Sequence, residues 1–453
     1  MNESFLCAFP HKHELHHRAK GVLMIRFANT LLVAIALLIA LPAALSQSAQ
    51  GQTYTILHTF TNGPDGGAPM TGVTVDRGGN LYGTTTTPNS GSVFKLSTHN
   101  VLTTLYAFAG GNDGDMPDAN VVFGPNGILY GTTEFGGEVG GLPCQAISNE
   151  FHGCGMAFTL RPPAEICRTA SCPWQETIIN RFFPVLDYGA APGDGSLVFD
   201  QQGNIYGATI QGGRSGFGYG TVYELTYSNG GWTETVLYNF TDGQDGAYPN
   251  GVIFDSAGNL YGTTEGWFDA GTGEDRFGKV FQLVRSGSGW SENVLYAFQD
   301  GADGAAPEAD LVMDQQGNLY GTTSNGGAGG AGTVFELSPS GGGWTFKLLY
   351  SFSSGCNGSL ISEFPPGCGS QGSLIIDSAG NLYGTAVSTG ANGLGSVFEL
   401  TYPNWTYVPL HDFAGSDGQN PYGSLAFGPN GELYGTASAG GQDGFGVVFQ
   451  ITQ

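Results

Sequence analysis

The chain has 453 residues, of which 77 are glycine, 40% are apolar and 12% are aromatic. Disordered chains lack that aromatic content, so the composition indicates a glycine-rich folded protein. The sequence carries 38 acidic and 14 basic residues, a formal net charge of −24 at pH 7 that disfavours nucleic acid and anionic membranes as partners. Cations, including calcium, are the natural counter-ligands of such a surface.

Residues 1–46 have the organisation of a signal peptide. The short basic segment Met24-Ile25-Arg26 precedes an apolar run, 27–45, and a small-residue exit follows at Ala44-Leu45-Ser46. An uncleaved membrane anchor is the alternative, although the run is only just long enough to span. The true start could be Met24, which would make the four histidines before it irrelevant to the mature protein. We expect residues 47–453 to form one domain, extracellular, periplasmic or at the cell surface, and monomeric.

The tripeptide Leu-Tyr-Gly, once Ile-Tyr-Gly, recurs in seven copies that cover about residues 54–451. The recurring tyrosines are Tyr82, Tyr130, Tyr206, Tyr261, Tyr320, Tyr383 and Tyr434. Each copy has four short apolar runs bounded by Gly, Asp or Asn; in the fourth copy they are 251–255, 259–264, 279–283 and 293–298. Four strands in a unit of about 50 residues are typical of a β-propeller. We therefore predict an all-β, seven-bladed β-propeller of four-stranded blades.

The turns predict the order of strands within a blade. The pattern Asp-x-x-Gly-Asn, as in 314–318, indicates a tight hairpin between the first two strands. We place the Val-Ile-Phe strand innermost, Leu-Tyr-Gly second, Val-Phe-x-Leu third and Leu-Tyr-x-Phe outermost. The chain ends on a third-type strand, 447–451, and its first strand, 54–60, is of the outer type. That first strand should complete the last blade and leave no open edge.

Two further repeated features point to packing. The glycine after each recurring tyrosine lies inside a strand, which indicates close approach by a neighbour, and we expect an aromatic ring from the adjacent blade. Five tryptophans precede outer strands: Trp174, Trp232, Trp290, Trp344 and Trp405. A sugar-stacking belt is conceivable, but hydrophobic plugs under the hairpins are the favoured interpretation.

The repeat unit resembles a known family. Asn318 to Thr323 followed by Gly332 to Leu337 is close to the unit Gly-Asn-Leu-Tyr-Gly-Thr-Thr … Gly-Thr-Val-Phe-Glu-Leu, which looks like the GloVer (Gloeo/Verruco) tandem repeat of exported bacterial proteins. Members often carry a C-terminal surface anchor, whereas this sequence stops right after a strand. The resemblance supports a propeller-like fold and export, and implies no particular activity.

The loops from outer to inner strands repeat an Asp-Gly pair, which offers one candidate site. Carboxylates that could form a calcium-binding ring are Asp65, Asp113, Asp242, Asp245, Asp300, Asp303 and Asp417. The alternative is turn chemistry, in which Asp bonds its own backbone and Gly takes a positive φ. Repetition in nearly every blade favours the turn interpretation, and the Asp-x-Asp-x-Asp spacing of calcium loops is absent.

Enlarged loops between the second and third strands of blades 2 and 4, together with the corresponding loop of blade 3 between them, offer a second candidate. Candidate ligand-binding residues there are Glu134, His152, Arg214, Glu265, Trp267, Asp269 and Asp275. A tryptophan amid carboxylates would suit a sugar or a cation. The alternative is that these loops differ through sequence drift at the surface and bind nothing.

The six cysteines after residue 46 fall into near pairs, which in an exported protein indicate disulfides. The local spacings favour Cys144 with Cys154, Cys167 with Cys172 and Cys356 with Cys368. A zinc site is the rival interpretation.

The sequence has few of the motifs that are typical of enzymes, and we assign no catalytic residue. The sequence has no Gly-x-Ser-x-Gly elbow, His-Glu-x-x-His helix or phosphate loop. We expect a binding or interaction module that acts through the top-face loops of blades 2 to 4 on a glycan, peptide or cation. An extracellular polysaccharide lyase or hydrolase with a carboxylate site and a structural envelope protein are the alternatives.

Overall fold

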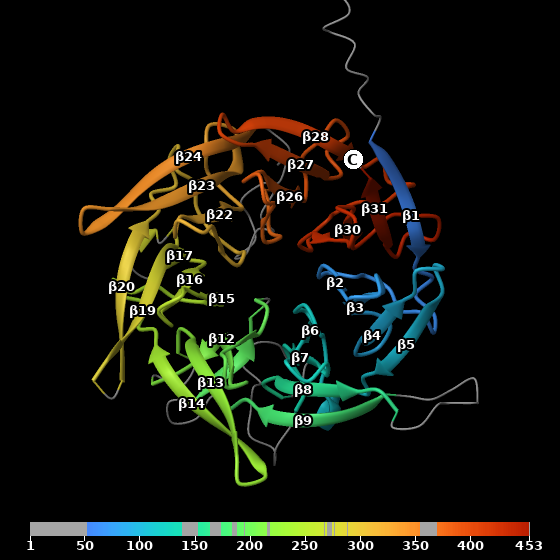
Figure 1. Ribbon diagram of the computed structural model, residues 1–453, viewed down its shortest axis with the longest axis horizontal. Coiled ribbons are helices and arrows are strands. Elements are labelled where there is room, and N and C mark those ends of the chain that lie inside the picture. The colour runs from blue at the N-terminus through green and yellow to red at the C-terminus, as the bar shows by residue number, and fades with distance from the viewer. Residues whose placement is uncertain are drawn as a thin grey trace, which may run out of the picture. The chain divides into compact units, whose positions relative to one another are not determined.

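The structure is a computed structural model that describes residues 52–137, 153–163, 174–183, 188–193, 195–214, 218–266, 268–269, 274–275, 277–287, 289–353 and 369–452. All its strands belong to one compact unit, Thr53–Gln453. Seven antiparallel sheets stand around a common axis as the blades of a propeller (Figure 1). The predicted all-β, seven-bladed propeller is confirmed.

Each blade runs from an inner strand at the axis to an outer strand, and blades 1 to 7 follow chain order. The inner strands are β2 (Thr74–Val75), β6 (Val122–Phe123), β11 (Val198–Phe199), β15 (Pro249–Phe254), β21 (Val312–Met313), β25 (Ile375–Ile376) and β29 (Ala426–Phe427). The second strands are β3 (Leu81–Thr85), β7 (Leu129–Thr133), β12 (Ile205–Gly212), β16 (Leu260–Thr264), β22 (Leu319–Thr323), β26 (Leu382–Ala386) and β30 (Leu433–Ala437).

The third strands are β4 (Ser92–Leu96), β8 (Met156–Arg161), β13 (Thr221–Ser228), β19 (Lys279–Ser286), β23 (Gly330–Ser340), β27 (Ser396–Thr401) and β31 (Val447–Thr452). The outer strands are β5 (Leu102–Ala107), β9 (Gln175–Arg181), β14 (Gly231–Asn239), β20 (Gly289–Ala297), β24 (Gly343–Ser353), β28 (Thr406–Asp412) and, in blade 7, β1 (Thr53–Thr59). Outside this pattern are β10 (Gly189–Pro192) in blade 3, the pair β17 (Phe268–Asp269) and β18 (Glu274–Asp275), and the short helix η1 (Gly111–Asp113).

The predicted closure of the ring is confirmed. Strand β1 pairs antiparallel with β31, with Thr53 opposite Thr452 and Thr59 opposite Val447. The first strand therefore forms the outer edge of the last blade, and β29, β30 and β31 supply its other three strands. This arrangement covers the edge that β31 would otherwise present.

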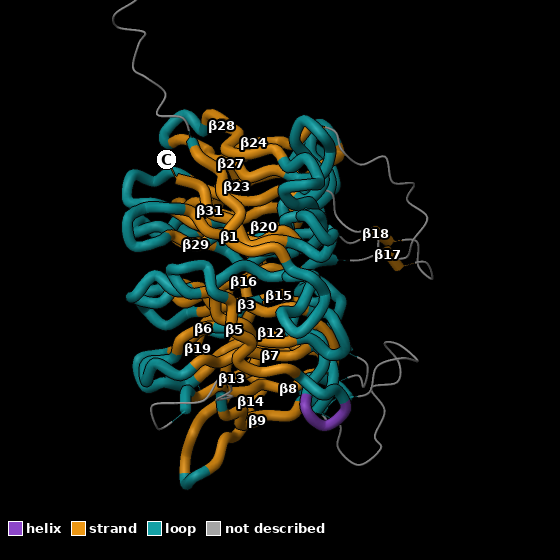
Figure 2. The backbone as a smooth tube through the Cα atoms, turned by 90° about the vertical axis from the view of Figure 1, so that its right-hand side faces the viewer, coloured by secondary structure: helices purple, strands orange, loops and turns teal. Residues whose placement is uncertain are grey.

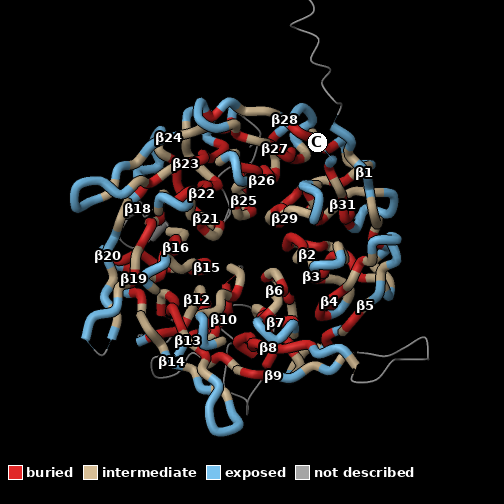
Figure 3. The backbone as a smooth tube through the Cα atoms, viewed as in Figure 1, coloured by how far each residue is buried: buried red, intermediate tan, exposed pale blue. Residues whose placement is uncertain are grey.

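Burial follows position in the blade (Figure 3). All five residues of β16 are buried, because neighbouring blades cover both faces of a second strand. In the outer strand β20 the first five residues alternate between exposed and half-buried, since one face meets solvent. The core is therefore a series of layers between adjacent blades.

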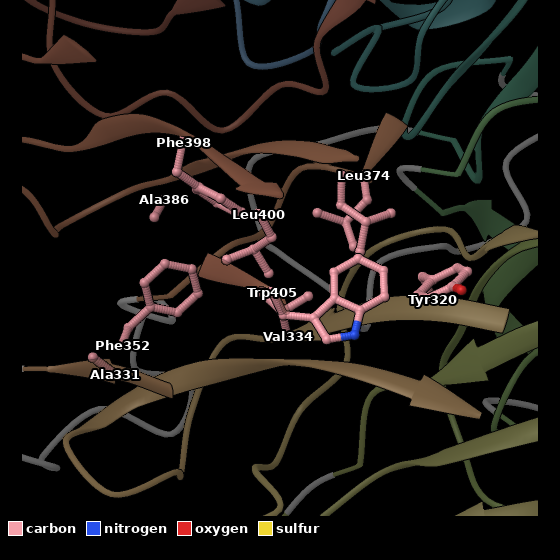
Figure 4. Close-up of a cluster of buried hydrophobic side chains, with 10 residues drawn as sticks. Tyr320, Ala331, Val334, Phe352, Leu374, Ala386, Phe398, Leu400 and Trp405 are labelled. Atoms are coloured by element: carbon pink, nitrogen blue, oxygen red, sulfur yellow. The ribbon is translucent and has the colours of Figure 1, made fainter. Parts of the chain in front are cut away.

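Tryptophan fills these layers near the hairpins. Trp405 of blade 6 lies with its ring centroid 5.7 Å from that of Tyr320 in blade 5, beside Leu374 (Figure 4). Trp344 contacts Tyr261 of blade 4 in the same way, at 5.9 Å. These contacts agree with the plug interpretation rather than with a sugar-stacking belt.

The glycine inside each second strand has a different neighbour from the one expected. A Cβ placed on Gly321 would lie 2.6 Å from Cζ of Phe335, which is its register partner on the third strand of the same blade. The expected ring from the adjacent blade is therefore wrong. Phe298 of blade 4 instead packs edge-on against Phe335, at 5.2 Å, so the adjacent blade's aromatic ring forms the next layer.

Loops gather on two opposite faces of the propeller (Figure 2). One face carries the predicted tight hairpins, in which an aspartate organises the turn: Oδ1 of Asp314 accepts from the backbone N–H of Asn318, and Oδ2 accepts from the hydroxyl of Tyr320. The opposite face carries η1 and the β17–β18 pair (Figure 2) and is called the top face below. The candidate site opens there.

Candidate functional site

A cavity of about 320 Å³ lies at the axis, and all seven blades line it. We call it the axial cup. The blades contribute the segments that precede their inner strands, including Thr71, Asp118, Gly195, Asn250, Asp310, Ser373 and Ser424. A cavity lined by every blade is a natural ligand site in a closed ring.

A recurring proline positions these segments. It is present in six blades, as Pro69, Pro117, Pro192, Pro249, Pro307 and Pro421. Each one packs on a positive-φ glycine before the third strand of the preceding blade, so that a Cβ on Gly220 would lie 2.5 Å from Cδ of Pro249. This contact fixes where the following residues meet the axis. The residue after the proline differs in every copy: Met70, Asp118, Gly193, Asn250, Glu308 and Tyr422.

The charged residues of the lining are all acidic. Asp118, Glu265, Glu308 and Asp310 line the cup, and no Lys, Arg or His is among its lining residues in the described part of the chain. Glu265 is the first residue after β16, and Glu134 holds the same position after β7 in blade 2. The repeat therefore directs both glutamates, each from the end of a second strand, toward the top face.

The first carboxyl pair belongs to blade 2. Burial raises the pKa of Asp118 to about 6. Burial, followed by the charges of Asp118 and Asp115, raises the pKa of Glu134 to about 8. Loss of hydration disfavours the charged form, and a neighbouring negative charge adds to that effect. Glu134 is therefore largely protonated at neutral pH while the cup holds no cation.

The second pair joins blades 4 and 5. Burial and the charge of Glu308 raise the pKa of Glu265 to about 8. Burial also raises the pKa of Glu308, although hydrogen bonds from Ser324 and Gln371 oppose the rise. Ser324 Oγ donates to Glu308 Oε1 at 2.7 Å, and Gln371 Nε2 donates to Oε2. Glu308 is held in place from two sides, whereas Glu265 accepts no such bond from the described residues.

A polar network closes the floor of the cup. Ser196 N–H donates to Asp310 Oδ2 at 3.0 Å, and Asp310 N–H donates to Ser373 Oγ at 3.1 Å. Asn120 Nδ2 donates to Ser196 Oγ at 3.2 Å and to Ser424 Oγ at 3.1 Å. These bonds connect blades 2, 3, 5, 6 and 7 across the ring.

The structure brings together only part of the predicted ligand-binding set. Glu265 lines the cup, and Glu134 lies beside Asp118. Arg214 is exposed beyond the end of β12. His152 and Trp267 lie outside the described residues, and Asp269 and Asp275 are described only as backbone of β17 and β18.

The Asp-Gly aspartates are occupied by their own loops. Asp245 accepts bonds from Thr241 N–H at 2.9 Å and from the hydroxyl of Tyr238 at 3.2 Å. Asp65, Asp113, Asp303 and Asp417 accept comparable bonds from a backbone N–H and from a Tyr or His side chain. Asp242 and Asp300 have positive φ of 58° and 53°. These contacts favour the turn interpretation, and a calcium ring on these loops stays a prediction.

The disulfide predictions fall mostly outside the described residues. Cys154 is buried beside Ala190, and Cys144, Cys167, Cys172, Cys356 and Cys368 lie in segments that are not described. The three pairings therefore remain predictions.

Sequence reasoning missed Asp118, Asn120, Glu308 and Asp310. The available signal was variation inside the repeat: the proline recurs almost unchanged, while the residues that follow it differ from copy to copy. Within the described ranges, no group of three His, Cys, Asp or Glu residues is placed to hold a metal ion. Nor does any described helix have the length and apolarity needed to cross a membrane.

A family model described as the Gloeobacter/Verrucomicrobia repeat matches residues 146–364 and 359–453, more than half of the chain. The chain belongs to this repeat family. The resemblance drawn from the repeat unit is thereby confirmed. No curated protein sequence matches the chain.

Solved structures with the same fold share little sequence with this repeat protein. A polysaccharide lyase of family PL25, an ulvan lyase bound to -[GlcA(1-4)Rha3S]-, is 11% identical over 87% of this chain and 95% of its own, with a TM-score of 0.52. The extracellular domain of BT4673 from B. thetaiotaomicron is 10% identical over 88% of this chain and 40% of that chain, with a TM-score of 0.50. At such identities the likeness shows the fold alone.

Proposed function

We propose that this chain is an exported binding module that holds a positively charged ligand in its axial cup. The observation that carries the proposal is the set of carboxyl groups at the cup without a basic residue in the described lining. Acidic side chains that serve only structure are commonly paired with Lys or Arg when they are buried. Here the missing counter-charge is supplied by the ligand.

The raised pKa values support the same conclusion. Glu134 and Glu265 each have a pKa of about 8, raised by burial and by neighbouring carboxylates. A bound cation reverses both effects, because opposite charge favours the ionised carboxyl group. The free energy recovered in this way contributes to binding, so the cup selects cations over neutral ligands of similar size. A glycan or a peptide would bind here through a cationic group.

Thermal unfolding with a panel of ligands tests the proposal. The panel is calcium, magnesium, spermidine, a short lysine peptide and a neutral oligosaccharide, since any ligand that binds the folded state raises the midpoint. We expect at least one cation to raise it and the neutral sugar to leave it unchanged. The double variant Glu134→Gln, Glu265→Gln should lose most of the shift. Asp443→Asn, which removes one exposed charge from outside the lining of the cup, is the matched control.

The proposal fails if no cation shifts the midpoint, or if the shift is the same in the double variant as in Asp443→Asn. A shift with the neutral sugar alone would replace cation binding by glycan binding.

A second candidate, an extracellular polysaccharide lyase or hydrolase, rests on the same two glutamates. A glutamate whose pKa is held near 8 stays protonated at neutral pH and can act as a general acid, as at Glu134 and Glu265. Product formation from acidic polysaccharides, measured by reducing ends and by absorbance of unsaturated uronic acid, tests it. Activity that persists in the double variant would exclude these residues as the acid.

A further inference from the structure

The floor of the axial cup is made of oxygen-bearing side chains that occupy one register position. Asn120, Asp310 and Ser424 each stand three residues after the recurring proline of their blade, and Ser373 lies at the same distance before the inner strand of blade 6. All four line the cavity. The repeat thus converges several different oxygen donors on the axis.

Two of the floor's oxygen atoms have unmet hydrogen-bonding capacity. Oδ1 of Asp310 and Oδ1 of Asn120 are shut off from solvent and have no hydrogen-bond partner among the described residues. The other ends of these side chains are committed, since Asp310 Oδ2 accepts from Ser196 N–H and Asn120 Nδ2 donates to Ser196 Oγ. A buried polar atom without a partner costs free energy, and a bound ion is one of the groups that satisfies it.

We infer that the floor of the cup binds a hard divalent cation of the calcium type, with Asp310 Oδ1 and Asn120 Oδ1 among its ligands. The inference rests on the proposed function and deepens it, because it names the class of ligand and the place in the cup where that ligand binds. Calcium takes six to eight oxygen ligands from carboxylates, amides, hydroxyls and water. The floor presents carboxylate, amide and serine oxygens and no nitrogen or sulfur ligand from a His or Cys in the described lining.

The rest of the cup complements a divalent ion. One floor carboxylate neutralises a single positive charge, and Asp118, Glu265 and Glu308 on the wall supply further negative charge. The cavity of about 320 Å³ leaves room for the ion to keep water ligands. The floor combines one carboxylate with amide and hydroxyl groups, which is why it is not a cluster of three His, Cys, Asp or Glu residues.

The shape of blade 4 makes space for Asp310. A Cβ on Gly251 would collide with Asp310 Oδ1, so only glycine at 251 leaves the carboxylate in its position in the floor. A Cβ on Gly195 of blade 3 would lie 2.4 Å from Cα of Gly251, so a side chain on either residue would push the two blades apart. The carboxylate therefore occupies a place that two glycines of neighbouring blades leave open.

Terbium luminescence tests this site, because Tb³⁺ replaces calcium at oxygen sites and emits when a nearby tyrosine transfers its excitation. Tyr422 lines the cup and supplies that ring. We expect Tb³⁺ to bind the purified protein at one saturable site and calcium to displace it. Asp310→Asn and Asn120→Ala should each weaken binding by at least about tenfold, because the first removes the negative charge of the floor and the second removes a ligand oxygen. Tyr422→Phe should lose most of the emission while Tb³⁺ still binds, measured by equilibrium dialysis.

Each outcome of these experiments either supports or overturns the metal site. Binding that is unchanged in Asp310→Asn and Asn120→Ala, with both variants folded by circular dichroism, overturns the site. Weak, non-saturating emission that Asp443→Asn alters equally indicates ions scattered on the acidic surface and also overturns it. If spermidine or the lysine peptide raises the unfolding midpoint through Glu134 and Glu265 while Tb³⁺ and calcium do not bind, the proposed function stands and the metal site falls. If none of these ligands binds, both the proposed function and the metal site are overturned.

Discussion

Asp310 Oδ2 accepts a hydrogen bond of 3.0 Å from the backbone N–H of Ser196, a residue 114 positions earlier in the chain. The bond joins blade 5 to blade 3, and the other carboxylate oxygen, Oδ1, lies where a side chain on Gly251 of blade 4 would stand. Stability and ligand binding therefore depend on one small region at the axis.

Replacing Gly251 by alanine should damage both properties. The new Cβ would collide with Asp310 Oδ1, so the floor must shift, and overpacking of this kind costs about 1–3 kcal/mol. Urea unfolding measures the loss, and Tb³⁺ titration should show weaker binding. Gly231→Ala is the matched control, since a Cβ there meets nothing within 4 Å. Equal stability of the two variants would show that the floor tolerates the displacement.

The cost of a steric clash at the glycine between adjacent blades can be measured separately from the cost of backbone strain. Gly220 and Gly230 both have positive φ, 95° and 83°, but only a Cβ on Gly220 meets neighbours, the carbonyl oxygen of Thr209 at 2.3 Å and Cδ of Pro249 at 2.5 Å. Gly230→Ala should cost about 1 kcal/mol from φ alone. Gly220→Ala should cost about 2–4 kcal/mol, because the steric clash adds to that strain. Denaturant unfolding of both variants checks the difference, and similar losses would mean that the neighbours of Gly220 move aside at little cost.

The free energy of unfolding should fall as the pH rises from about 5 to about 8. The pKa of Glu134 and that of Glu265 are each raised to about 8 in the folded protein from an ordinary value of 4.5. The folded state therefore binds more protons than the unfolded state between these limits. The stabilisation from these groups is complete below pH 4.5 and is lost as the pH rises through 8.

Urea unfolding at pH 5 and pH 8.5 measures this dependence. Half-buried acids, among them Glu176 and Glu292 with pKa values raised to about 7, act in the same direction. The informative quantity is therefore the comparison with Glu134→Gln, Glu265→Gln, whose profile should be flatter than that of the wild type. Parallel profiles would show that these glutamates are ionised in both states.

Cation binding should release protons and strengthen with pH. A cation in the cup favours the ionised form of Glu134 and Glu265, so protons leave as it enters. Calorimetric titration of calcium at pH 7 in two buffers of different ionisation enthalpy measures the number released. We expect a positive release that disappears in the double variant, and an affinity that rises between pH 6 and pH 8. A binding enthalpy independent of the buffer would contradict the linkage.

Regular features of the repeat were predictable from sequence, and the site was predictable only in part. The seven recurring tyrosines fix the blades, and the phase of the terminal strands fixes closure, because these features obey local strand and turn chemistry. Glu134 and Glu265 were found because they follow the second strand in enlarged loops. Asp118 and Asp310 were not predicted as site residues, because nothing in their local sequence distinguishes them from the variable residues of a surface loop.

The expectation for the second-strand glycine shows the same limit. The sequence indicates a close neighbour at Gly321, but register decides that the neighbour is Phe335 of the same sheet. Which residues converge at the axis likewise depends on how all seven blades are placed around it. That placement is a property of the closed ring and is encoded in no single repeat.

The pairing of β1 with β31 also has a consequence for how the protein is made. Blades 1 to 6 each consist of a contiguous stretch of chain, so each can fold as soon as its own strands have been synthesised. Blade 7 needs Thr53–Thr59 and Val447–Thr452, the two most distant strands, and contacts of such high sequence separation form slowly. Until the last strand arrives, β1 has no partner and offers an edge that can recruit another nascent chain. Assembly of the cup is therefore delayed to the final step of biosynthesis, and a prematurely terminated chain would produce an open ring that exposes strand edges to aggregation and proteolysis.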